Sequence, residues 1–156
     1  MPDTGTVRKL GTKRGWGLNL EQSLDENTGV FARLARSDGA SEVYAFAEID
    51  NSLSLGVSLK GARWGRALDS FGLAYARNGL SSSHRAYLAA GGLGFFVGDG
   101  RLNYRPESIT EAYYSLGVNV LKRSAISLGL QHIRNPAYNA DRGPVWVGSL
   151  RLHTEF

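Results

Sequence analysis

The chain has 156 residues, of which 42% are hydrophobic and 21% are charged. It contains no cysteine, which excludes a disulfide framework and a thiolate metal site. Its net charge of +4 comes from basic residues scattered among acidic ones, whereas nucleic-acid binding requires a clustered basic face. We therefore expect no nucleic-acid partner, and we expect neither a metal ion nor an organic cofactor.

Apolar and polar residues alternate along most of the chain, the pattern of a β-strand with two different faces. In the last segment, Trp146, Leu150 and Leu152 share one parity while Arg151 and Glu155 share the other. A short helix is expected within one of the longer connections, at 82–90. Eight segments are predicted as strands, at 16–21, 30–34, 42–49, 53–60, 71–75, 111–120, 126–131 and 145–156.

Short polar turns predict antiparallel hairpins between these strands. They lie at 25–29, 37–39, 50–51 and 122–124, and longer connections run through 78–109 and 135–144. If these strands cross an outer membrane and the C-terminus lies on the periplasmic side, the connections 37–39, 61–68 and 122–124 would also be periplasmic. The two long connections would then be extracellular, together with short loops at 25–29 and 50–51.

A soluble β-sandwich would also alternate, but strands of ten or more residues are long for a sandwich. The chain also ends on Phe156, which closes an alternating strand. These features favour an all-β fold in the form of an antiparallel transmembrane β-barrel, with about eight strands in this chain. No apolar stretch reaches the roughly 18 residues of a membrane-spanning helix. The first residues do not resemble a signal peptide, so an exported protein would lack its export signal in this sequence.

Two loop sequences, GDGRLNYRPE at 98–107 and NPAYNADRGP at 135–144, are specific because strand periodicity does not dictate them. With them, the chain resembles the carbohydrate-selective (glucose-selective) porins of Gram-negative bacteria from about Gly15 onward. The resemblance implies diffusion of sugars across the outer membrane through a barrel of roughly sixteen strands. This chain would then form the C-terminal half as one domain, with 1–13 irregular. The other similar stretches are 15–22, 43–50, 53–61, 64–66, 87–96, 111–114, 131–134 and 150–156.

The polar parity supplies the candidate pore-lining residues, which either contact sugars or form salt bridges that brace the wall. They are Asn19, Glu21, Arg33, Glu42, Tyr44, Glu48, Lys60, Glu111, Tyr113, Asn119, Gln131, Arg151 and Glu155. Candidates for a constriction by an inward-folded loop, which otherwise belong to an ordinary surface loop, are His84, Arg85, Tyr87, Asn103, Tyr104 and Arg105.

The expected partners are sugars as transported solutes, outer-membrane lipid and lipopolysaccharide, the barrel assembly machinery through Phe156, and a second copy of the chain. Catalysis is not expected, because Ser83-His84 lacks the flanking glycines of a nucleophile elbow. The three histidines are too dispersed to form a metal site. Two alternatives remain open: a closed eight-stranded outer-membrane barrel with a structural or adhesive role, and a soluble carbohydrate-binding sandwich.

Overall fold

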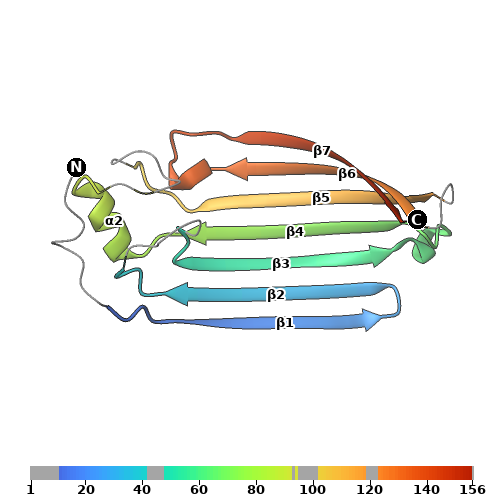
Figure 1. Cartoon of the computed structure of the whole chain (residues 1–156), viewed down its shortest axis with the longest axis horizontal. Coiled ribbons are helices and arrows are strands. Elements are labelled where there is room, and N and C mark those ends of the chain that lie inside the picture. The colour runs from blue at the N-terminus through green and yellow to red at the C-terminus, as the bar shows by residue number, and fades with distance from the viewer. Residues whose placement is uncertain (1–10, 42–47, 93, 95–101, 119–122, 156) are drawn as a thin grey trace.

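The computed structural model describes residues 11–41, 48–92, 94, 102–118 and 123–155. These residues form one seven-stranded antiparallel sheet in which every strand pairs with its neighbours in sequence (Figure 1). Residues 11–14 have no regular structure, and 1–10 lie outside the described residues. The strands are β1 (Gly15–Asp25), β2 (Thr28–Ser37), β3 (Asn51–Lys60), β4 (Ser70–Gly79), β5 (Glu107–Val118), β6 (Arg123–Arg134) and β7 (Val145–Glu155).

The strands are ten to twelve residues long, so each extends about 33–40 Å. Strands of that length, tilted as in outer-membrane barrels, cross an apolar band of about 25 Å. The expectation of an all-β antiparallel fold is confirmed. The expected helix at 82–90 is α2 (Ser82–Ala89), whose N-cap residue Ser81 accepts a hydrogen bond from the His84 amide at 3.0 Å. The described connections also contain two 3-10 helices, η1 (Gly61–Trp64) and η2 (Pro136–Tyr138).

The sheet leaves no place for the predicted strand 42–49 between β2 and β3. β2 pairs directly with β3, with Leu34 opposite Leu53 and Val30 opposite Val57. Residues 42–47 lie outside the described residues, and Glu48 and Ile49 belong to no strand. Alternation shows only that a segment can present two faces. Pairing is decided by the register that joins apolar residues of adjacent strands.

This pairing also corrects the expected distribution of turns between the two ends of the sheet. The short-turn end carries the connections 25–28, 60–70 and 118–123 and the end of β7. The long-connection end carries 37–51, 79–107 and 134–145, together with α2 (Figure 1). Turn 25–29 therefore lies at the same end as the C-terminus, and 37–39 lies at the opposite end. Short turns at one end and long connections at the other match the rule for bacterial outer-membrane barrels.

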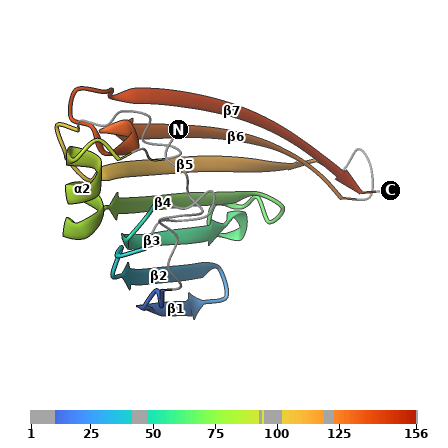
Figure 2. The same cartoon turned by 60° about the vertical axis from the view of Figure 1, so that its left-hand side comes forward.

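The buried apolar residues lie among the long connections and not beneath the sheet. Leu80, Leu88 and Tyr138 form this small core, with Leu102 and Tyr104 packed against it. The sheet curves as one layer, with α2 and η2 at the long-connection end (Figure 2). Among the described residues, no helix has the length and apolar composition needed to cross a bilayer.

The single layer decides between the alternative architectures. Within the described part of the chain no second sheet covers the first, so the soluble sandwich is wrong. β1 and β7 are the two edges of the sheet and do not pair with each other. The closed eight-stranded barrel is therefore not the observed arrangement either.

Candidate functional site

The two faces of the sheet differ in chemistry along its whole width. Residues opposite each other on paired strands point to the same side, so the register assigns every side chain to a face. One row of the apolar face runs through Leu20, Ala32, Leu55 and Tyr75. The adjacent row of the polar face runs through Glu21, Phe31, Gly56, Ala74, Glu111 and Gln131.

No other described segment covers the apolar face. Its leucines and tryptophans are exposed, up to 66% for Leu150 and 72% for Leu152. A soluble protein of this size would bury such a face against a second layer. The uncovered face therefore fits hydrocarbon, and the opposite, polar face fits contact with water.

Arg33 organises the polar face near the β1 edge. Its Nη2 atom donates to Glu21 Oε1 at 2.8 Å, and its Nε atom donates to Asn19 Oδ1 at 3.1 Å. Its guanidinium carbon lies 5.2 Å from the centre of the Phe31 ring. The side chain is thus fixed by a carboxylate, an amide and an aromatic face, while both charged groups of the Arg33–Glu21 pair stay more than half exposed.

Two aromatic rings lie against this face because glycines leave room for them. A Cβ atom added to Gly56 would lie 2.4 Å from Cε1 of Phe31, and one added to Gly72 would lie 2.2 Å from Cε1 of Tyr113. Any side chain larger than hydrogen at either glycine would push the ring away from the wall. Glycine in these strands therefore serves close aromatic packing.

These groups surround a shallow hollow of about 530 Å³ on the polar face. Its lining includes Glu21, Phe31, Glu111 and Tyr113. Glu111 is positioned by Gln131, whose Nε2 atom donates to Glu111 Oε2 at 2.9 Å. Carboxylates beside aromatic surfaces suit a polyhydroxylated solute, which offers hydroxyl donors at its edges and an apolar ring face.

The register brings most of the predicted pore-lining residues to this one face. Asn19, Glu21, Arg33, Glu111, Tyr113 and Gln131 lie around or next to the hollow, whereas Lys60, Arg151 and Glu155 lie on the same face toward the short-turn end. Glu155 approaches His153 Nε2 at 3.5 Å. Glu48 lies in the connection between β2 and β3, and Glu42, Tyr44, Asn119 and the terminal Phe156 lie outside the described residues. Contact of any of these side chains with solute stays a prediction.

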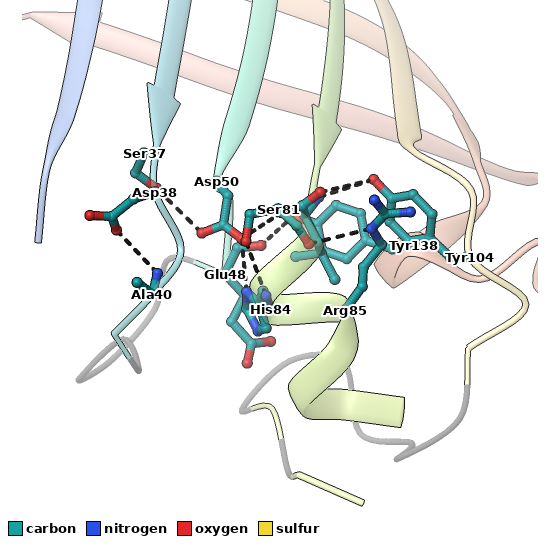
Figure 3. Close-up of polar contacts among 11 residues, drawn as sticks. Ser37, Asp38, Ala40, Glu48, Asp50, Ser81, His84, Arg85, Tyr104 and Tyr138 are labelled. Atoms are coloured by element: carbon teal, nitrogen blue, oxygen red, sulfur yellow. Dashed lines mark hydrogen bonds and ion pairs between the residues drawn. The ribbon is translucent and has the colours of Figure 1, made fainter. Parts of the chain in front are cut away.

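The loop candidates tie the long connections to one another (Figure 3). His84 Nδ1 lies 3.0 Å from Asp50 Oδ2, and Arg85 stacks on Tyr104 at 4.7 Å from the ring centre. Tyr87 is 47% exposed. Asn103 Nδ2 donates to Asp141 Oδ1 at 3.0 Å, and the Arg105 amide donates to the Tyr138 carbonyl at 2.9 Å.

Asp50 is the centre of this arrangement, although the sequence indicated only a turn residue. Its side chain is fully buried and also accepts a hydrogen bond from the Ser81 amide at 2.8 Å. Burial opposes ionisation, but the hydrogen bonds from Ser81 and His84 outweigh it and hold the pKa of Asp50 below its ordinary value. Burial raises the pKa of Tyr138, whose hydroxyl donates to the Glu48 carbonyl oxygen at 2.6 Å.

Sequence reasoning missed Phe31 as a site residue. The available signal was parity, because Phe31 alternates with Val30 and Ala32 and shares the parity of Arg33. Within the described residues, no group of three or more His, Cys, Asp or Glu side chains is placed to hold a metal ion.

Comparisons with known proteins agree with this geometry. The sequence model described as "Carbohydrate-selective porin, OprB family" matches residues 1–156. The structure of OprB from Pseudomonas putida at high pH superposes with a TM-score of 0.72 and 22% sequence identity, over 92% of this chain and 36% of that chain. No curated protein matches the chain in sequence. At that identity the structural likeness shows the fold, which is that of an outer-membrane β-barrel wall.

Proposed function

Because the chain belongs to the OprB family of carbohydrate-selective porins, we propose that it forms part of the wall of a channel through which sugars diffuse. The family and its barrel fold place the chain in the Gram-negative outer membrane. Proteins of this family are channels, and a channel makes and breaks no covalent bonds. Its selectivity comes from groups that replace part of the hydration shell of the solute.

The observation that carries this proposal is the position of Tyr113 and Phe31 on the polar face, beside Glu21 and Glu111. The Phe31 ring packs close to Gly56 and the Tyr113 ring packs close to Gly72, so both rings lie beside the hollow, where they can contact the apolar face of a pyranose. The carboxylates accept hydrogen bonds from sugar hydroxyl groups, and Arg33 and Gln131 hold them in place. Each contact is weak and open to water, as diffusion requires.

The chain spans 36% of the length of the Pseudomonas putida porin that it matches. We infer that this sheet is one domain that contributes a sector of a wider barrel, in which other strands pair with β1 and β7. The unpaired edges support this inference, because exposed edge strands are otherwise sites of aggregation. Recognition of the terminal Phe156 by the assembly machinery and association between copies remain predictions.

The test replaces Tyr113 with alanine in the full-length protein encoded by the gene. The variant protein is reconstituted in planar bilayers. Sugar binding is measured as the concentration of maltose that halves the ion current. Loss of one stacking surface is worth about 1 kcal/mol, so Tyr113→Ala should raise this concentration about fivefold. The matched control is Tyr75→Ala, which removes the same side chain from the apolar face. The proposal fails if Tyr113→Ala leaves the half-blocking concentration unchanged, or if Tyr75→Ala shifts it equally.

A further inference from the structure

The apolar face changes character at the long-connection end. β2 and β4 both run toward this end, and on both an arginine follows the last apolar side chain of this parity. Val30, Ala32 and Leu34 are followed by Arg36, and Phe71, Leu73 and Tyr75 are followed by Arg77. β6 repeats the pattern and ends at Arg134. The register confirms the face, since Arg36 lies opposite Trp16 and Arg77 lies opposite Leu53.

The guanidinium groups of Arg36 and Arg77 are exposed, and within the described part of the chain no hydrogen bond or ion pair engages them. The acidic groups nearby already have other donors. Asp38 accepts from the amides of Arg14 and Ala40, and Glu107 accepts from the amide of Ala137 at 3.0 Å. Arg33, by contrast, is paired on the polar face. Arg36 and Arg77 therefore have no counter-charge among the described residues, and both lie on the face proposed to meet lipid.

A hollow of about 410 Å³ lies between these two arginines. We call it the outer-margin hollow, lined by Trp16, Leu34, Arg36, Leu53, Arg77 and Tyr104. Leu34 and Leu53 make its floor apolar, while Arg36 and Arg77 provide cationic groups on either side of β3. Trp16 and Tyr104 are aromatic residues of the kind that mark the level of a membrane interface.

Position along the strand determines what such cations meet. An arginine on the lipid face strongly destabilises a barrel at the bilayer midplane but has little effect near the interface. Arg36 is the last but one residue of β2, and Arg77 lies two residues before the end of β4, so both belong to the interfacial level. The anions present there are lipid phosphates, which guanidinium groups bind in a bidentate manner.

We propose that the outer-margin hollow binds a phosphorylated lipid of the outer leaflet. Arg36 and Arg77 hold a phosphate group of the headgroup, and an acyl chain of the same lipid packs on Leu34 and Leu53. This inference rests on the proposed membrane orientation, in which the long connections are extracellular. The proposed ligand is a phosphate carried by a lipid and not a free phosphate ion. An acyl chain would cover the apolar floor next to the cations, whereas a free anion would leave that floor exposed.

The experiment measures binding of the full chain to vesicles that contain lipid A with its phosphates or the same lipid after dephosphorylation. The wild-type chain should bind the phosphorylated lipid at least about tenfold more tightly. The double variant Arg36→Gln, Arg77→Gln should lose that preference. Arg36→Lys with Arg77→Lys should retain part of it, since lysine keeps the charge but not the bidentate geometry. Arg63→Gln, at an exposed arginine of the short-turn end, is the matched control and should bind as wild type does.

Folding of each variant is checked by heat-modifiable electrophoretic mobility, and sugar block of the current is measured in parallel. An unchanged phosphate preference in the double glutamine variant would overturn the inference. Saturation of the detergent-solubilised chain by inorganic phosphate at the same affinity would overturn it as well. If sugar block is normal but lipid binding does not depend on the phosphates, the lipid inference is wrong and the channel proposal stands. Phosphate-dependent lipid binding without sugar block would instead contradict the proposed channel function.

Discussion

Each end of the sheet contains a buried aspartate that accepts several hydrogen bonds, Asp69 at one end and Asp50 at the other, but the two aspartates join different parts of the chain. At the short-turn end, the Asp69 side chain is 1% exposed. It accepts hydrogen bonds from Arg66, from the Tyr114 hydroxyl at 2.6 Å and from the Gly117 amide at 3.0 Å. At the long-connection end, Asp50 is 0% exposed and accepts from the Ser81 amide, from His84 and from Ser37 Oγ at 3.3 Å.

The difference lies in what each carboxylate joins. Asp69 connects its own turn, which contains Arg66, to Tyr114 and Gly117 of strand β5. One of its three hydrogen-bond donors, Arg66, carries a permanent positive charge. Asp50 joins the end of β2 to the start of α2, 44 residues apart between Ser37 and Ser81, and thereby holds separate connections together. An outer-membrane barrel has short turns at one end and long loops at the other, and the long loops must be held in a defined position. A buried aspartate supplies a fixed point at each end.

The strongest test of this comparison is Asp50→Ala. The substitution leaves the Ser81 amide and His84 without their acceptor at a fully buried position, which should lower the free energy of unfolding by about 3 kcal/mol. The long connections should become sensitive to protease while the strands stay protected. Asp38→Ala is the control, because Asp38 is an exposed carboxylate in the same connection. Equal losses in the two variants would mean that Asp50 is not the fixed point.

A smaller effect is expected from Asp69→Asn, which preserves the shape but removes the charge that strengthens the bonds from Arg66 and Tyr114. The midpoint of thermal unfolding in detergent should fall by about 5 °C. The long connections should keep their protease resistance. Asp25→Asn is the control, because Asp25 pairs with Arg63 at 2.6 Å but is half exposed. A change in protease cutting at the long connections would show that the two ends are not independent.

The sequence predicted the strands because lipid on one face and water on the other impose a period of two. Parity also predicted that Asn19, Arg33, Glu111 and the other candidates on described strands share one face, since parity survives any register, but it did not predict that Glu48 lies in a connection. It failed where pairing partners matter: the alternation at 42–49 does not place a strand between β2 and β3, and Asp50 reads as a turn residue. Likewise, Tyr113 lies over Gly72 only because β4 and β5 pair in the observed register. These relations depend on which residues of neighbouring strands face each other, and alternation along one strand does not reveal that.

The smallest expected effect is a change in thermal stability at acid pH, which isolates the contribution of the Asp69 charge. The hydrogen bond from Arg66, followed by that from Tyr114, lowers the pKa of Asp69 from 3.8 to about 2. A carboxyl group whose pKa is depressed by folding stabilises the folded state above its unfolded pKa. That contribution is lost as the pH falls through the folded value. The difference in thermal midpoint between the wild-type chain and Asp69→Asn should therefore be constant from pH 7 to about pH 5 and shrink between about pH 4 and pH 2. Thermal unfolding recorded in steps of pH measures this difference directly. A gap that persists undiminished at pH 2 would show that the asparagine acts through its shape, and that the charge of Asp69 does not fasten the short-turn end.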